Sequence, residues 1–254
     1  MAGTSGGQEG EPRPPDLWLT ERARWPTLDD ANDNMREERG LPAGDFSEWM
    51  IEMQGALRGE RGSDVPCGGC TACCTSSQFI HIGPDEAGTL SRIPPALLFP
   101  APGLPRGHVV LGYDDEGHCP MLIDDKCSIY EDRPRTCRTY DCRVFPAAGL
   151  GIDDDEKVLI ARQVRRWQFS FPTEAHRNQH AAVRAAATFL RDGRGLLPNG
   201  AVPTDATRHA VLAIELHQLF LGRDEETGET TVVDPGPEVI RVELIRRREP
   251  RDAT

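Results

Sequence analysis

The eight cysteines are the residues of this sequence with the clearest chemical potential, and all of them lie between residues 67 and 142. The first four form a C-x-x-C-x-x-C-C run: Cys67, Cys70, Cys73 and Cys74. Two thiolates separated by two residues can converge on one metal ion because the turn between them curls the backbone and aims amide groups at sulfur. Gly68 and Gly69 allow this turn with little strain. A disulfide between the neighbours Cys73 and Cys74 would be strained, which favours sharing them between two metal ions or between a metal and a redox role.

The other four cysteines are more widely spaced, with seven, nine and four residues between them: Cys119, Cys127, Cys137 and Cys142. Eight thiolates suffice for two four-cysteine zinc sites or for iron–sulfur clusters of the 4Fe-4S type with four cysteines each. The opening C-x-x-C-x-x-C is similar to a bacterial ferredoxin run, although the fourth cysteine follows at once instead of three residues later. This pattern favours an iron–sulfur cluster over zinc and leaves both open.

The two cysteine blocks together resemble the YkgJ-type cysteine-cluster family, which has a CxxCxxCC signature and is described as zinc- or iron-chelating. The resemblance covers residues 67–143, and it implies that Cys67, Cys70, Cys73, Cys74, Cys119, Cys127, Cys137 and Cys142 are metal ligands. It also places five further residues in the signature: Ile129, Tyr130, Arg133, Pro134 and Arg138. The same family includes the flagellin lysine N-methylases. The sequence has no glycine-rich strand-turn-helix fingerprint for a nucleotide-like cofactor, and the catalytic residues stay unknown.

Two arginines flank Cys137 and suggest a role beside the metal. The guanidinium groups of Arg133 and Arg138 would lower the pKa of nearby thiols and offset the negative charge of a thiolate site. The alternative is that they form surface ion pairs with nearby acids: Glu131, Asp132 and Asp141. Pro134 is expected to fix the turn that delivers Cys137, and Tyr130 to pack beside the site.

Histidines and acids offer weaker candidates for metal binding. One histidine inside the cysteine window could replace a thiolate on zinc: His81, His108 or His118. His176 and His180 lie four residues apart on an expected helix, and a solvated helix face is the favoured interpretation. The acidic residues 153–156 are best explained as a helix cap and solvated loop rather than a cation site.

The amino-acid composition indicates the cellular environment of the protein and disfavours some classes of partner. The net charge of −12 comes from 41 acidic and 29 basic residues, so repulsion disfavours nucleic acid and anionic membranes as partners, while an unknown protein partner stays possible. No apolar run approaches the about 20 residues that span a bilayer, and the first thirty residues lack a secretory apolar region. We therefore expect a cytoplasmic protein, where thiols stay reduced and a disulfide scaffold is disfavoured.

The sequence pattern around the cysteines predicts the elements that position them. We expect a small α+β fold, with a metal-stabilised cysteine-rich core of short strands and turns flanked by helices. We expect a disordered lead over residues 1–44, a cysteine-cluster metal-binding domain over 45–150 and a mainly helical extension over 151–254. An amphipathic helix with Asp45 as its N-cap should lead into the cysteines. Residues 108–113 and 119–123 should form a hairpin across the turn 114–117, and the proline-rich residues 94–105 a loop.

The extension is expected to hold helices at residues 173–191 and 204–221, the second closed by Gly222. Residues 154–169 are either a helix or a strand pair, and residues 230–233 and 239–245 should form a terminal hairpin. Taken together, the sequence predicts a metal-chelating cysteine-cluster protein whose metal is structural or redox-related. The alternative is an iron–sulfur-dependent enzyme, an oxidoreductase or a relative of the protein lysine N-methylases.

Overall fold

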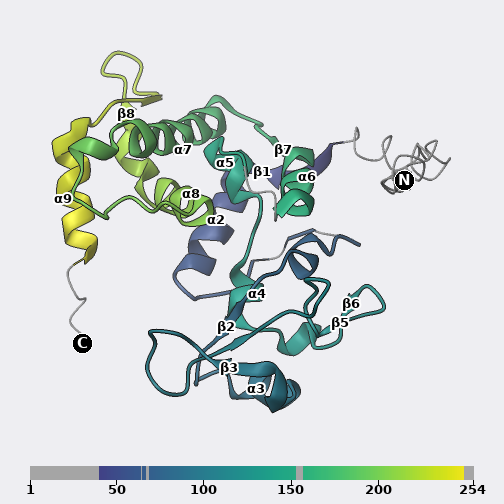
Figure 1. Cartoon of the computed structure of the whole chain (residues 1–254). Coiled ribbons are helices and arrows are strands. Elements are labelled where there is room, and N and C mark those ends of the chain that lie inside the picture. Colours follow the sequence, from purple (N-terminus) through teal and green to yellow (C-terminus); the bar gives the residue numbers. More distant parts are fainter. Residues whose placement is uncertain (1–39, 64, 67–68, 153–156, 249–254) are drawn as a thin grey trace, which may run out of the picture. The chain divides into compact units, whose positions relative to one another are not determined.

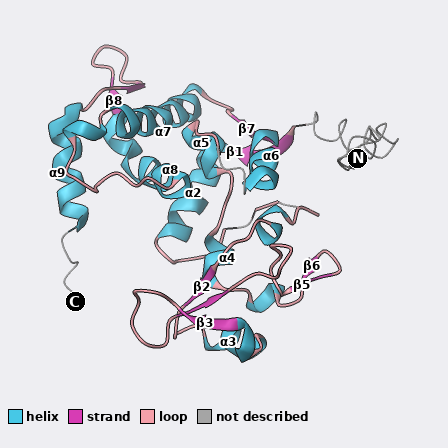
Figure 2. Cartoon of the chain, viewed as in Figure 1, coloured by secondary structure: helices cyan, strands magenta, loops and turns pink. Residues whose placement is uncertain are grey.

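The computed structural model describes residues 40–63, 65–66, 69–152 and 157–248 (Figure 1). It is a mixed α+β structure, as predicted, in which helices alternate with short strands (Figure 2). The α-helices are α2 (Phe46–Leu57), α3 (Ala87–Arg92), α4 (Arg135–Thr139), α5 (Val144–Ala148), α6 (Val158–Arg166), α7 (Glu174–Asp192), α8 (Ala206–Leu216) and α9 (Gly236–Arg248). Among the described residues, no helix combines the length and the apolar character needed to cross a membrane.

The strands are short and form four small sheets. They are β1 (Leu41–Asp45), β2 (Ile80–Ile82), β3 (Leu98–Pro100), β4 (Val109–Leu111), β5 (Leu122–Ile123), β6 (Lys126–Cys127), β7 (Trp167–Ser170), β8 (Leu221–Arg223) and β9 (Thr230–Val232). Strand β1 pairs in parallel with β7, and the order β2-β4-β3 forms the three-stranded sheet. The pairs β5-β6 and β8-β9 are antiparallel.

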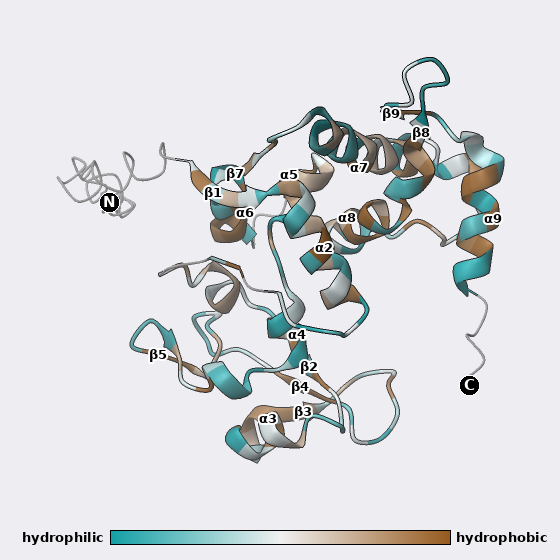
Figure 3. Cartoon of the chain, turned by 180° about the vertical axis from the view of Figure 1, so that it is seen from behind, coloured by the Kyte–Doolittle hydropathy of each residue, from teal (hydrophilic) through white to brown (hydrophobic). Residues whose placement is uncertain are grey.

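The larger hydrophobic core belongs to the helices. It joins the buried faces of α2, α5, α7 and α8 with residues of α6 and α9. In α9, Ile240 and Leu244 are buried one turn apart, whereas hydrophilic residues alternate with them along the helix (Figure 3). Burial of such apolar stripes is the main source of helix stability in a folded protein.

A second, much smaller core lies within the cysteine-rich part of the chain. Its buried residues are Ile82, Ile93, Leu111, Met121 and Ile129, and Cys119 and Cys127 pack against it. So small a core buries little apolar surface, and small domains of this kind usually rely on a metal or on disulfides for stability.

Several elements differ from the sequence predictions in the first half of the chain. Residues 41–45 form β1 and are not part of an irregular lead; residues 1–39 of that predicted lead lie outside the described residues. The hairpin predicted for residues 108–113 and 119–123 is wrong, because β4 pairs with β2 and β3. One of these partners, β3, comes from the proline-rich segment predicted as a loop, where Pro95–Leu97 makes a 3-10 turn before the strand.

The C-terminal part also departs from the predictions. The helix predicted to end at Gly222 ends earlier, at Leu216, followed by a 3-10 turn over His217–Phe220. Gly222 lies instead in β8 opposite Thr231. A Cβ at Gly222 would come within 2.6 Å of the Val233 side chain, so the close approach requires glycine. The predicted terminal hairpin is wrong, because β9 pairs with the preceding β8 and residues 236–248 form a helix.

The N-cap predicted for α2 is present and gives a first testable result. The Asp45 carboxylate accepts hydrogen bonds from the amides of Ser47 and Glu48, at 2.9 and 3.1 Å, and lies 3.1 Å from His176 Nδ1. Asp45→Ala should lower the free energy of unfolding by about 1 kcal/mol, because two amides at the helix start lose their acceptor. Asp45→Asn keeps the cap and should cost much less in the same urea titration. Equal losses in both variants would assign the effect to the His176 ion pair instead.

Candidate metal centre

The first cysteine block is shaped by a tight turn. Cys67 lies outside the described residues, and Cys70 precedes η1 (Ala72–Thr75), the 3-10 turn that carries Cys73 and Cys74. The Cys74 amide donates to the carbonyl of Thr71 over 2.7 Å, which closes the turn. This geometry places the sulfurs of Cys73 and Cys74 3.9 Å apart.

The second block is held against the first by the backbone. The amide of Cys119 donates to the carbonyl oxygen of Cys74 over 2.7 Å. Cys127 follows on β6, and Cys137 lies on α4 directly after Pro134. The predicted role of Pro134 at the entry to the Cys137 turn is therefore confirmed.

Backbone amides act on two of the thiols. Burial raises the pKa of Cys70, and the Ala72 amide partly offsets that rise. Burial likewise raises the pKa of Cys119, and the amides of Met121 and Leu122 partly offset it. Such N–H groups favour the thiolate form, which is the form that binds metal. The Ala72 amide belongs to the second C-x-x-C step, from Cys70 to Cys73, whereas the turn predicted for Gly68 and Gly69 includes Gly68, which is outside the described residues.

The thiols of the two blocks lie within electrostatic range of one another. Burial raises the pKa of Cys137 to about 12, and the charges of Cys73, Cys119 and Cys127 add to that effect. Burial also raises the pKa of Cys119, with further contributions from Cys127 and Cys73. Thiolates at these positions would repel one another, which holds the thiols in their protonated form, and a bound cation would relieve that repulsion.

The adjacent pair behaves as a unit. A hydrogen bond from the Cys74 thiol lowers the pKa of Cys73 to about 7, and the same bond raises the pKa of Cys74. The pair thus gives up its first proton easily and holds the second tightly.

The donor set fits a thiophilic metal. Six described cysteines are free thiols: Cys70, Cys73, Cys74, Cys119, Cys127 and Cys137. Soft sulfur donors are the ligands that zinc and iron–sulfur clusters take. Within the part of the chain that the structure describes, no three histidine, cysteine or carboxylate side chains already converge on one metal position. The cysteines near one another are Cys70, Cys73, Cys74, Cys119, Cys127 and Cys137.

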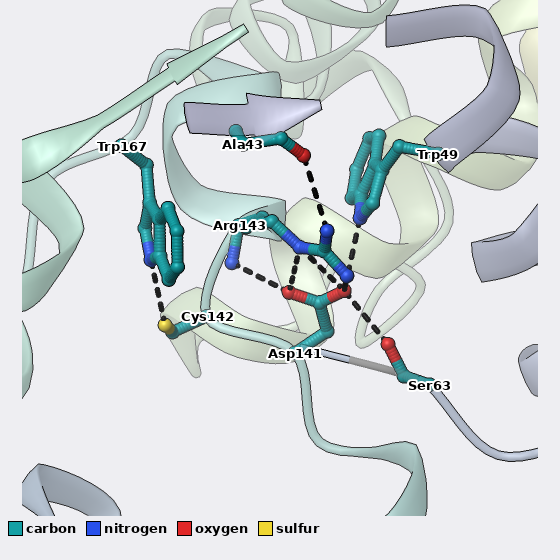
Figure 4. Close-up of polar contacts among 7 residues, drawn as sticks. All are labelled: Ala43, Trp49, Ser63, Asp141, Cys142, Arg143 and Trp167. Atoms are coloured by element: carbon teal, nitrogen blue, oxygen red, sulfur yellow. Dashed lines mark hydrogen bonds and ion pairs between the residues drawn. The ribbon is translucent and has the colours of Figure 1, made fainter. Parts of the chain in front are cut away.

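Cys142 lies in a different environment from the other described cysteines. It is 7% exposed and packs in the larger, helical core. The indole nitrogen of Trp167 donates to its sulfur over 3.1 Å (Figure 4). The structure therefore places this predicted ligand at the boundary between the cysteine segment and the helices.

The residues on either side of Cys142 form a buried ion pair. Arg143 donates to the Asp141 carboxylate through Nε and Nη2, and both side chains are almost fully buried (Figure 4). The same carboxylate accepts from Trp49 Nε1 at 2.9 Å and Ser63 Oγ at 2.8 Å. Arg143 also reaches the Ala43 carbonyl at 3.1 Å. Sequence reasoning had offered Asp141 as a surface partner of other arginines, and that alternative is wrong because its side chain is enclosed by α2 and β1.

The two arginines near Cys137, Arg133 and Arg138, contact different partners. The charge of Arg133 partly offsets the raised pKa of Cys137, as predicted, and its guanidinium lies 3.9 Å from the centre of the Tyr130 ring. Arg138 approaches Glu86 at 3.8 Å, a partner that the sequence did not suggest. Tyr130 is exposed beneath Arg133.

The histidine candidates are engaged elsewhere. His81 and His108 stack on each other with their ring nitrogens 2.9 Å apart, and His118 lies 3.7 Å from a Glu116 carboxylate oxygen. The predicted solvated face of His176 and His180 is wrong, because His180 is packed between the rings of Phe46 and Phe171 and burial lowers its pKa. The acidic residues 153–156 lie outside the described residues.

Sequence reasoning missed the contribution of α6. This helix contacts η1. Burial raises the pKa of Cys70, and the positive charge of Arg166 partly offsets that rise. Gln163, one turn earlier, is buried. No cysteine marks this helix, so a search for ligand residues passes over it.

Comparison with known proteins agrees with these observations. Residues 66–162 match the model of the CxxCxxCC family, described as a "putative zinc- or iron-chelating domain". The match extends past the last cysteine into α6. Comparisons with curated proteins and with solved structures gave no match. Residues 66–162 of this chain are therefore similar to the "putative zinc- or iron-chelating domain" of the CxxCxxCC family.

Proposed function

We propose that Cys70, Cys73, Cys74, Cys119, Cys127 and Cys137, together with Cys67, supply the thiolates of a metal centre whose first role is structural. The observation that carries this proposal is the meeting of the two blocks, where the Cys119 amide donates to the Cys74 carbonyl and thiolates of both blocks would repel one another. A cation at this place would neutralise that repulsion and tie the two blocks together.

The structural role follows from the size of the local core. Five buried hydrophobic residues support the cysteine-rich part, against a much larger set in the helices. A structural zinc ion contributes about 10–16 kcal/mol to folding at neutral pH, which exceeds the net stability of most domains. The cysteine-rich segment then owes its fold to the metal.

The neighbouring sulfurs of Cys73 and Cys74 favour an iron–sulfur cluster over zinc. A cluster offers several iron atoms, so adjacent thiolates and additional cysteines can each find a metal partner. The amides directed at the sulfurs of Cys70 and Cys119 would then tune the potential of the cluster. When bound, such a group supplies one-electron chemistry or a purely structural link.

Metal and sulfide analysis of the full chain purified anaerobically tests this proposal. We expect iron and acid-labile sulfide in near-stoichiometric amounts, with visible absorbance that dithionite bleaches. A colourless protein with zinc and no sulfide would keep the thiolate centre and reject the iron–sulfur assignment. A protein that takes up neither metal after anaerobic reconstitution would refute the proposed centre.

A further inference from the structure

Helix α6 carries two polar residues one turn apart, Gln163 and Arg166, which form its polar edge. Residues at this spacing share one edge of a helix, and Arg166 Nη1 donates to Gln163 Oε1 over 3.4 Å. The neighbouring face of α6 buries Ile160 and Val164 in the helical core. Gln163 also lies three residues after Ile160, so the polar edge borders the buried apolar face of the same helix.

The Gln163 side chain is unusual because it is buried although its amide nitrogen donates no hydrogen bond to the described residues. Gln163 is 5% exposed, and its Nε2 has no hydrogen-bond acceptor among the described residues. Buried polar groups in folded proteins are nearly always hydrogen-bonded, so an unused donor requires an explanation. A methionine of similar size would fill this position without the cost of burying an amide.

The location of the polar edge supplies that explanation. Helix α6 contacts η1, which carries Cys73 and Cys74, and the charge of Arg166 acts on Cys70. Metal-bound thiolates are strong acceptors, and N–H groups directed at them tune the affinity and the potential of a centre. The first cysteine block thus offers an acceptor on the side that α6 faces.

We propose that Gln163 and Arg166 are positioning residues of the metal centre. Gln163 Nε2 donates a hydrogen bond to a metal-bound sulfur of Cys70, Cys73 or Cys74, and Arg166 balances the negative charge of these thiolates. This inference rests on the proposed function. It adds a helix without cysteines to the centre.

Titration of Co²⁺ into the reduced, metal-free full chain tests the role of Gln163, because thiolate-to-cobalt absorbance reports sulfur ligation. Gln163→Met should weaken Co²⁺ binding about tenfold, the lower end of the range for residues that support a ligand. The same variant should raise the melting temperature of the metal-free protein by about 2–4 °C, because an unsatisfied buried amide is removed. A purely structural role would lower that temperature.

Arg166→Gln should also weaken Co²⁺ binding, whereas Arg165→Gln is the matched control. Arg165 is the exposed neighbour on α6, and its replacement should change neither measurement. Wild-type affinity in Gln163→Met, or a lower melting temperature of its metal-free form, would overturn the inference. Absence of the charge-transfer band in the wild type would instead refute the metal centre itself, and the two failures are thereby distinguished.

Discussion

Replacement of Cys70 by serine is expected to release the metal and to unfold the cysteine-rich part of the chain. Burial raises the pKa of the Cys70 thiol, the Ala72 amide and the charge of Arg166 partly offset that rise, and serine offers a poor ligand in its place. Loss of one of four thiolates forfeits much of the about 10–16 kcal/mol that a structural metal contributes. The five-residue core of this part is too small to replace that contribution.

Hydrogen exchange and metal content together measure this outcome. Amides of β2, β4 and α4 should lose protection in Cys70→Ser, whereas those of α7 and α8 should keep it, since they belong to the helical core. Cys142→Ser is the matched control, because its sulfur packs in that core beside Trp167. It should keep the metal. Full metal content and full protection in Cys70→Ser would remove the proposed structural role.

The second large effect concerns the buried pair of Asp141 and Arg143. Arg143→Ala should destabilise the protein by about 3–5 kcal/mol, because the Asp141 carboxylate stays enclosed without its cation. Urea unfolding followed by tryptophan fluorescence measures the loss, and Trp49, which donates to this carboxylate, reports it directly. Arg191→Ala removes an arginine from an exposed pair with Asp192 and should leave the urea midpoint almost unchanged.

A double variant separates the charge from the packing. Asp141→Asn combined with Arg143→Met removes both charges and retains most of the volume, so it should be less destabilising than Arg143→Ala alone. A double variant at least as unstable as the single one would show that the effect comes from packing rather than from an uncompensated charge.

Sequence patterns predicted the elements that are fixed by residues close together in the chain. The helix after Asp45 follows from its cap and from the spacing of Phe46, Trp49, Met50 and Met53, all of which are buried. Residues 239–245 show the limit of such signals. Their β-branched side chains favour a strand, yet Ile240 and Leu244 bury one helical face, and tertiary packing outweighs the local preference.

The membership of the candidate centre was only partly accessible from sequence. Spacing identified the first block, whose backbone turn is local. It could not show that Cys119 bonds to Cys74 while Cys142 packs beside Trp167, because those contacts join distant segments. The burial of Asp141 and the unused amide of Gln163 likewise depend on what surrounds them. Neither the burial of Asp141 nor the unused amide of Gln163 can be recognised from a pattern in the sequence.

The parallel pairing of β1 with β7 has a consequence for the life of the metal centre. One strand precedes the cysteine-rich segment and the other follows it, so the pairing turns that segment into a loop closed at its base. When the metal leaves, the two ends of the loop stay together as long as the helical core holds. Reassembly then starts from a tethered chain, and most of the entropy of bringing its ends together has already been lost. Refolding of the segment around a new metal ion should therefore cost less chain entropy than folding of the same segment with free ends.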